Sequence, residues 1–259
     1  MLTEYIIICI FALIGSGLTF FSGFGLGTIL VPVFAIFFPI ELAIALTAIV
    51  HFLNNIFKLT LIGKNASRQI IFKFGLPAIF SAFLGAYLLT FIADIEPFYS
   101  YSISTKTFYI TPIKLTIALL LSVFALFDII PKLTKLNFDQ KYIPLGGLLS
   151  GFFGGLSGNQ GALRTAFLIR ANLTKESFIA TGVVIAVLID ISRLTVYSSD
   201  ILKLGNKIDY TLLISVTLSA FTGAIIGNRV LKKITIKTLQ FVVGIMLFVF
   251  AILLGFGII

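Results

Sequence analysis

Apolar runs of about 20 residues, the length a helix needs to cross a bilayer, follow one another along almost the whole chain. This feature limits the possible folds more than any other. Of the 259 residues, 59% are hydrophobic and 11% are charged, and the mean hydropathy is +1.13. In soluble domains, roughly a quarter of all residues are charged. We therefore predict an all-α integral membrane protein.

Ten hydrophobic segments are predicted, and two of them are too short to cross a membrane. The short ones, 26–38 and 161–171, each follow a glycine-rich break, SGFGLG at 22–27 and SGNQG at 157–161. Glycine permits local unwinding of a membrane helix, so we interpret both as broken, re-entrant helices. The other segments are 4–21, 41–63, 69–94, 112–130, 142–156, 175–199, 209–231 and 236–257.

The second half of the chain repeats the first. With a shift of 135 positions, residues 22–60 align with residues 157–195 without a gap and with nine identities in 39 positions. Matched pairs include Ser22 with Ser157, Gly23 with Gly158, Glu41 with Glu176, Asn55 with Asp190, and Lys58 with Arg193. We predict an N-terminal repeat, 1–130, and a C-terminal repeat, 131–259, of five segments each within one transmembrane unit.

Basic residues orient the two repeats. The chain has 19 Lys and Arg against 10 Asp and Glu, a net charge of +9, and the basic residues gather in short loops. Such loops stay in the cytoplasm, so the charge indicates membrane topology and we expect no nucleic-acid partner. The loops within 64–73, 132–141 and 232–237 then face inward, while 95–111 and both termini face outward. The halves are thus inverted repeats, as in many secondary transporters.

The sequence around both breaks is similar to a known family. Residues 22–34, SGFGLGTILVPVF, with A-x-A-L-T at 43–47, resemble the first signature of the sulfite exporter TauE/SafE family. Residues 146–164, GGLLSGFFGGLSGNQGALR, with Thr181 and DISRLTVY at 190–197, resemble its second. The resemblance implies transport of sulfur-containing anions such as sulfite or sulfonates. Many members carry G-x-G-G at the second break, where this chain has GNQGALR, and this departure bears on the substrate.

We expect the substrate to bind near the middle of the membrane, where the two breaks approach one another. Backbone N–H groups, the amides of Asn159 and Gln160, and the guanidinium of Arg164 can all donate to an anion. The alternatives are that Arg164 snorkels to the interface and that the two amides cap the following helix. The predicted substrate-binding residues are Ser22, Gly23, Gly25, Gly27, Asn55, Ser157, Gly158, Asn159, Gln160, Gly161, Arg164 and Thr181.

Two polar stripes are candidates for coupling or gating. His51, Asn55 and Lys58 share one helix face, and Asp190, Arg193 and Tyr197 share another. Ionisable groups inside membrane segments are costly, so they usually face a cavity or pair with one another. Histidine titrates near neutral pH, so His51 is a candidate proton carrier, with Asp190 as the alternative. A structural Asp190–Arg193 ion pair and snorkelling of Lys58 and Arg193 are the competing interpretations.

These features predict a multi-pass transporter of the cell membrane that works by alternating access, with proton coupling left open. A passive anion channel is the alternative, although the polar groups cluster at the breaks and form no continuous stripe. One His, His51, and one Cys, Cys9, in separate segments offer no metal site, disulfide or nucleophile–base pair. We therefore expect no enzyme activity, metal or cofactor. The expected partners are a small anion and lipid, and a homodimer is left open.

Overall fold

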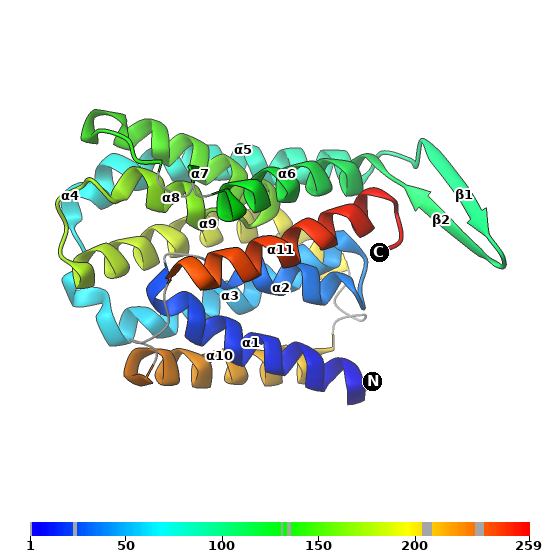
Figure 1. The fold of residues 1–259 in the computed structure, drawn as a ribbon, viewed down its shortest axis with the longest axis horizontal. Helices are drawn as coiled ribbons and strands as arrows, with labels where there is room; N and C mark the ends of the chain where they lie inside the picture. Colours follow the sequence, from blue (N-terminus) through cyan, green and yellow to red (C-terminus); the bar gives the residue numbers. More distant parts are fainter. Residues whose placement is uncertain (1, 23–24, 131, 134–135, 204–208, 231–235) are drawn as a thin grey trace.

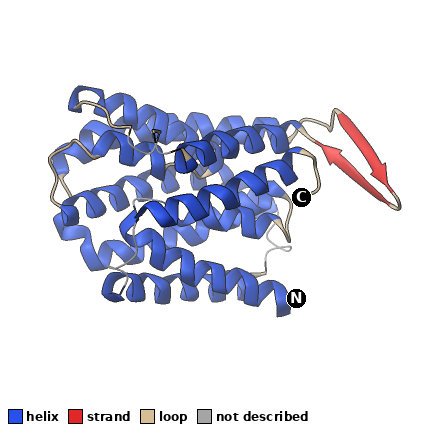
Figure 2. Ribbon diagram, in the orientation of Figure 1, coloured by secondary structure: helices blue, strands red, loops and turns tan. Residues whose placement is uncertain are grey.

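The computed structural model describes residues 2–22, 25–130, 132–133, 136–203, 209–230 and 236–259. Helices make up most of these residues and run roughly along one axis of the molecule (Figures 1 and 2). The longer elements are α1 (Leu2–Ser22), α2 (Leu26–Ala35), α3 (Ile40–Ile62), α5 (Leu76–Ala93), β1 (Tyr99–Ile103), β2 (Lys106–Ile110), α6 (Pro112–Ile129), α7 (Ile143–Ser157), α8 (Gly161–Leu168), α9 (Lys175–Lys203), α10 (Tyr210–Val230) and α11 (Ile236–Gly255). Short helical turns occupy Gly63–Asn65, α4 (Arg68–Ile70), Ile71–Gly75 and Gln140–Tyr142.

Six stretches of the described chain are helical, long and apolar enough to cross a membrane. They are Leu2–Phe20, Ile40–Asn65, Arg68–Ala93, Pro112–Ile129, Lys175–Ser198 and Tyr210–Arg229. The two segments predicted to be too short to span correspond to α2, with 10 residues, and α8, with 8. Mostly helical structure with several such spans agrees with the prediction of an α-helical membrane protein.

The described chain contains one sheet, a two-stranded β-hairpin. The antiparallel strands β1 and β2 join α5 to α6, with Tyr99 opposite Ile110. The hydroxyl of Tyr101 donates to the carbonyl oxygen of Phe256 at 2.7 Å, which fastens the hairpin to the end of α11. The all-helical prediction placed a loop here and missed the hairpin. The alternation YSYSI, with aromatic and β-branched residues, is typical of a strand.

Small residues let α5 and α7 approach until their backbones nearly touch. A Cβ atom on Gly151 would lie 2.2 Å from the carbonyl oxygen of Ala78, and one on Gly155 would lie 2.2 Å from that of Ala82. The larger side chains of α5, such as Phe80 and Phe91, are exposed on its outer face. Small residues inside and large apolar residues outside are expected of helices surrounded by lipid.

Helices of the two halves pack against one another in a reciprocal pattern. α1 packs on α10, and α7, its counterpart in the predicted repeat, packs on α5. α3 contacts α9 and α6 contacts α11, so each of these helices meets its counterpart in the predicted repeat. Both chain ends lie toward the end of the molecule that carries the hairpin (Figure 1). The boundary between the halves is therefore the interior of the molecule.

A surface hydrogen bond ties the start of α1 to the residue before α10. The hydroxyl of Tyr5 donates to the carboxylate of Asp209. Because this bond favours the ionised form, it lowers the pKa of Asp209 from its ordinary value.

Candidate functional site

The two helix breaks lie against each other inside the molecule. Gly158 ends α7 in the left-handed region, at φ +77°, which glycine adopts without strain. On the other side, Gly25 precedes the first turn of α2. A Cβ atom on Gly27 would lie 3.3 Å from the carbonyl oxygen of Gly158. Glycine at these positions allows the breaks of the two halves to meet.

Asp190 is the centre of a buried polar cluster between α3 and α9. One of its carboxylate oxygens lies 2.6 Å from Nδ1 of His51 and accepts a hydrogen bond from Asn55 at 3.3 Å. The other oxygen accepts from Nε of Arg193 at 3.0 Å. All four side chains are buried. The predicted Asp190–Arg193 ion pair is present, and the same carboxylate orients the His51 ring.

Arg193 and Tyr197 connect this cluster to the second break. The hydroxyl of Tyr197 donates to the carbonyl oxygen of Gly155, near the end of α7, at 2.5 Å. A Cβ atom on Gly158 would lie 2.8 Å from Nη1 of Arg193, so glycine leaves room for the guanidinium. Arg193 is fully buried. The interpretation of Arg193 as a snorkelling residue is therefore wrong.

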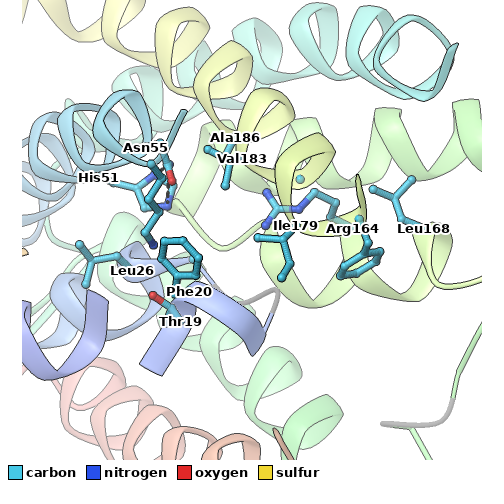
Figure 3. Close-up of a pocket in the computed structure, with 14 residues that line it drawn as sticks. Thr19, Phe20, Leu26, His51, Asn55, Arg164, Leu168, Ile179, Val183 and Ala186 are labelled. Atoms are coloured by element: carbon cyan, nitrogen blue, oxygen red, sulfur yellow. Dashed lines mark hydrogen bonds between the residues drawn. The ribbon is translucent and has the colours of Figure 1, made fainter. Parts of the chain in front are cut away.

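A cavity of about 460 Å³ lies between helices of the two halves (Figure 3). α1, α2 and α3 of the first half contribute to its lining, and α8 and α9 contribute from the second. Its polar lining consists of Thr19, His51, Asn55, Lys58 and Arg164. Apolar side chains and two glycines line the rest, and no acidic residue is among the described lining residues.

Two buried cations reach this cavity. Lys58 is 4% exposed, and its ammonium lies over the ring of Phe20, 5.5 Å from the ring centroid. Arg164 is 6% exposed, and its guanidinium points toward the side of the cavity where His51 and Phe20 lie (Figure 3). Snorkelling is therefore wrong for both. Positive charge prevails among the lining residues, and apolar walls strengthen its attraction for an anion.

Gln160 and Gly182 position the guanidinium of Arg164. Oε1 of Gln160 accepts a hydrogen bond from Nη1 of Arg164 at 3.4 Å. A Cβ atom on Gly182 would lie 3.3 Å from Nε of Arg164, so the glycine of α9 makes room for the side chain.

The alternative interpretation, that the side chains of Asn159 and Gln160 cap α8, is wrong. Gln160 is the N-cap residue, but its side chain makes no capping hydrogen bond. The Asn159 amide turns back toward Ser157 instead. Oδ1 of Asn159 and Nε2 of Gln160 are buried without a hydrogen-bond partner in the described part of the chain.

The structure divides the predicted site residues into two groups. Gly25, His51, Asn55, Lys58 and Arg164 line the cavity. Gly27, Ser157, Gly158, Asn159, Gln160, Gly161, Thr181, Asp190, Arg193 and Tyr197 do not. Thr181 instead accepts a hydrogen bond from the backbone of Ser67 at 2.8 Å. Ser22 ends α1, but its side chain and the whole of Gly23 lie outside the described residues.

Sequence reasoning missed the wall formed by Thr19 and Phe20 of α1 and the role of Gly182 in α9. Thr19 and Phe20 lie just before the first break, and that position was the only signal for them in the sequence.

A family model described as Sulfite exporter TauE/SafE matches residues 7–254. No curated protein and no solved structure matches the chain. The matched range contains both breaks and every residue that lines the cavity.

Proposed function

Because the chain belongs to the sulfite exporter TauE/SafE family, a family of membrane transporters, we propose that it carries a small sulfur-containing anion such as sulfite or a sulfonate. The observation that carries this proposal is the cavity between the halves, where Lys58 and Arg164 are buried and no described lining residue is acidic.

The chemistry of the two cations suits a sulfur oxyanion. The planar guanidinium of Arg164 can donate two parallel hydrogen bonds to a pair of oxygens on one sulfur atom. The ammonium of Lys58 adds a point charge, and Thr19 and Asn55 add polar groups. The apolar side chains of α9, including Ile179 and Val183, leave a wall for the organic group of a sulfonate.

We further propose that the halves are inverted repeats that expose this cavity alternately to the two sides of the membrane. The reciprocal packing of α1 on α10 and of α7 on α5 supports a two-fold relation between them. Substrate sites at the boundary of such repeats, next to broken helices, are typical of secondary transporters. A passive channel is less favoured, because the polar lining is clustered at one cavity.

A binding screen tests the substrate class. Purified protein is titrated calorimetrically with sulfite, methanesulfonate, thiosulfate and acetate. The proposal predicts saturable binding of at least one sulfur anion, and weaker binding of acetate, whose two oxygens leave part of the donor set unused. No binding of any sulfur anion, or equally tight binding of acetate, would contradict it.

A further inference from the structure

A second cavity, of about 420 Å³, lies on the other side of α8. α6, α8 and α11 contribute to its lining, together with residues that follow α6. Its polar lining consists of Asp128, Thr165 and Gln240, and the other described lining residues are apolar. None of the residues that line the first cavity belongs to it.

Asp128 is the unusual residue of this cavity. It lies one residue before the end of α6 and is 5% exposed. No hydrogen bond or ion pair joins its side chain to any other residue in the described ranges. No other titratable group is among the described lining residues. On α8 the one charged residue, Arg164, faces the first cavity, and residues 240–255 of α11 carry no charge.

α8 forms a wall of both cavities. Ala162, Thr165, Ala166 and Ile169, at helical spacing, face the second cavity. Arg164 and Leu168 face the first. Oγ1 of Thr165 is buried and has no hydrogen-bond partner among the described residues. One face of α8 therefore lines the cavity that holds Asp128, and another face carries the guanidinium of Arg164. A change in the charge of Asp128 acts on the helix that positions this guanidinium.

We propose that Asp128 binds the proton that is coupled to anion transport, an inference that rests on the proposed function. An unpaired carboxylate among apolar groups is costly as an anion, and taking up a proton removes that cost. A protonated carboxyl can also donate a hydrogen bond, and the oxygens of Thr165 and Gln240 line the same cavity.

Coupling follows from the position of α8. Without the proton, a negative charge lies against the face of α8 that carries Thr165, and with the proton that charge is absent. The two states therefore favour different positions of α8 relative to α6, across the cavity that the two helices line together with Gln240 of α11. Arg164 directly precedes Thr165, so it moves with the helix. His51 belongs to the other cluster, because its Nδ1 lies 2.6 Å from the carboxylate of Asp190.

The test uses purified protein in liposomes and labelled sulfite. Counterflow exchange at equal pH measures transport alone, and uptake under an inward proton gradient measures coupling. An internal pH dye follows proton entry. Asp128→Asn removes the titrating group with little change in shape. Asp139→Asn is the matched control, since Asp139 is exposed and pairs with Arg170 at the surface. Sulfite itself titrates in the same way in every sample, so the comparison isolates the protein.

In the wild type and in Asp139→Asn the gradient is expected to raise initial uptake at least about fivefold, the lower end of typical coupling between sites. Asp128→Asn should keep counterflow but lose both this stimulation and the proton entry. Stimulation by the gradient in Asp128→Asn, or stimulation of the wild type by sodium in place of protons, would overturn the inference.

Two further outcomes separate this inference from the proposed function. Counterflow without gradient stimulation in the wild type would overturn the proton site alone, while absence of counterflow would overturn both. If Asp128→Asn does not elute as a folded species, Thr165→Val replaces it. This variant removes the hydroxyl from the same cavity and should reduce the stimulation, and unchanged stimulation would contradict the inference.

Discussion

Lys58 and Arg193 align when the chain is shifted by 135 positions, yet the residue three positions before each of them differs in charge. Three residues before Arg193 stands Asp190, which neutralises it at 2.8 Å. Three residues before Lys58 stands Asn55, which carries no charge. Lys58 of the first half therefore lines the cavity, whereas Arg193 of the second half belongs to the cluster between α3 and α9. The charge that the second half contributes to the cavity comes from Arg164, which aligns with Ile29.

Removing either cavity cation should weaken anion binding. Arg164→Ala and Lys58→Met each delete a charged donor, and such bonds contribute about 1.5–3 kcal/mol, which is roughly tenfold to 150-fold in affinity. Arg170→Ala is the matched control, because Arg170 is exposed and pairs with Asp139 at the surface. Calorimetric titration with sulfite measures the dissociation constants of the two variants and of the control. Wild-type affinity in Arg164→Ala would remove the guanidinium from the site.

Removing the charge of Asp190 should destabilise the fold. Asp190→Asn leaves Arg193 buried without its counter-charge, and losing one partner of a buried pair costs about 3–5 kcal/mol. Asp139→Asn breaks an exposed pair, whose contribution is about 0–1 kcal/mol. Thermal unfolding of both variants in detergent measures the difference. Equal melting temperatures would show that the cluster does not stabilise the structure.

α7 and α8 show how much of an element the sequence can predict. The break between them was visible because SGNQG interrupts an apolar run, and α8 begins at the predicted residue, Gly161. Which face of α8 meets which cavity depends on the packing of α6 and α11, and the sequence did not contain that information. Asp128 was overlooked for the same reason, because an acidic residue near a helix end resembles a solvated one until α8 and α11 cover it.

A methyl group on the glycine face of α7 should disturb its packing on α5. In Gly151→Ala the added Cβ would lie 2.2 Å from the carbonyl oxygen of Ala78, so the helices must separate. Overpacking of this kind costs about 1–3 kcal/mol. Gly255→Ala is the control, because its Cβ meets its nearest neighbour at an ordinary 3.5 Å. Thermal unfolding should show a lower melting temperature for Gly151→Ala only. Equal melting temperatures of the two variants would refute the close approach of α7 and α5.

The whole molecule is held together mainly by contacts between its two halves, since α1, α3, α6 and α7 each pack on a helix of the other half. The repeat in the sequence predicted two similar units, but it could not reveal that they pack so extensively on each other. That arrangement comes from tertiary contacts between small residues, such as Gly223 of α10 against the backbone of Leu13. It also explains why the cavity draws its lining from both halves.

The topology predicts opposite labelling of two exposed positions. In a Cys9→Ser background, Ser100→Cys in β1 should react with a membrane-impermeant reagent added to intact cells. Asn65→Cys, in the basic connection between α3 and α5, should react only after permeabilisation, because short basic loops stay in the cytoplasm. Both positions are exposed in the structure, so accessibility does not limit either reaction. The reverse labelling pattern would show that the protein has the opposite orientation in the membrane.

Counterflow of labelled sulfite in liposomes tests the central claim most directly, that a carrier site lies between the two halves. The wild type and Arg170→Ala should accumulate label transiently and saturably when unlabelled sulfite is preloaded, because one site must bind the anion from each side in turn. Arg164→Ala should accumulate little at the same concentration. Absence of counterflow in the wild type, an unsaturable ohmic current, or full counterflow in Arg164→Ala would contradict the claim.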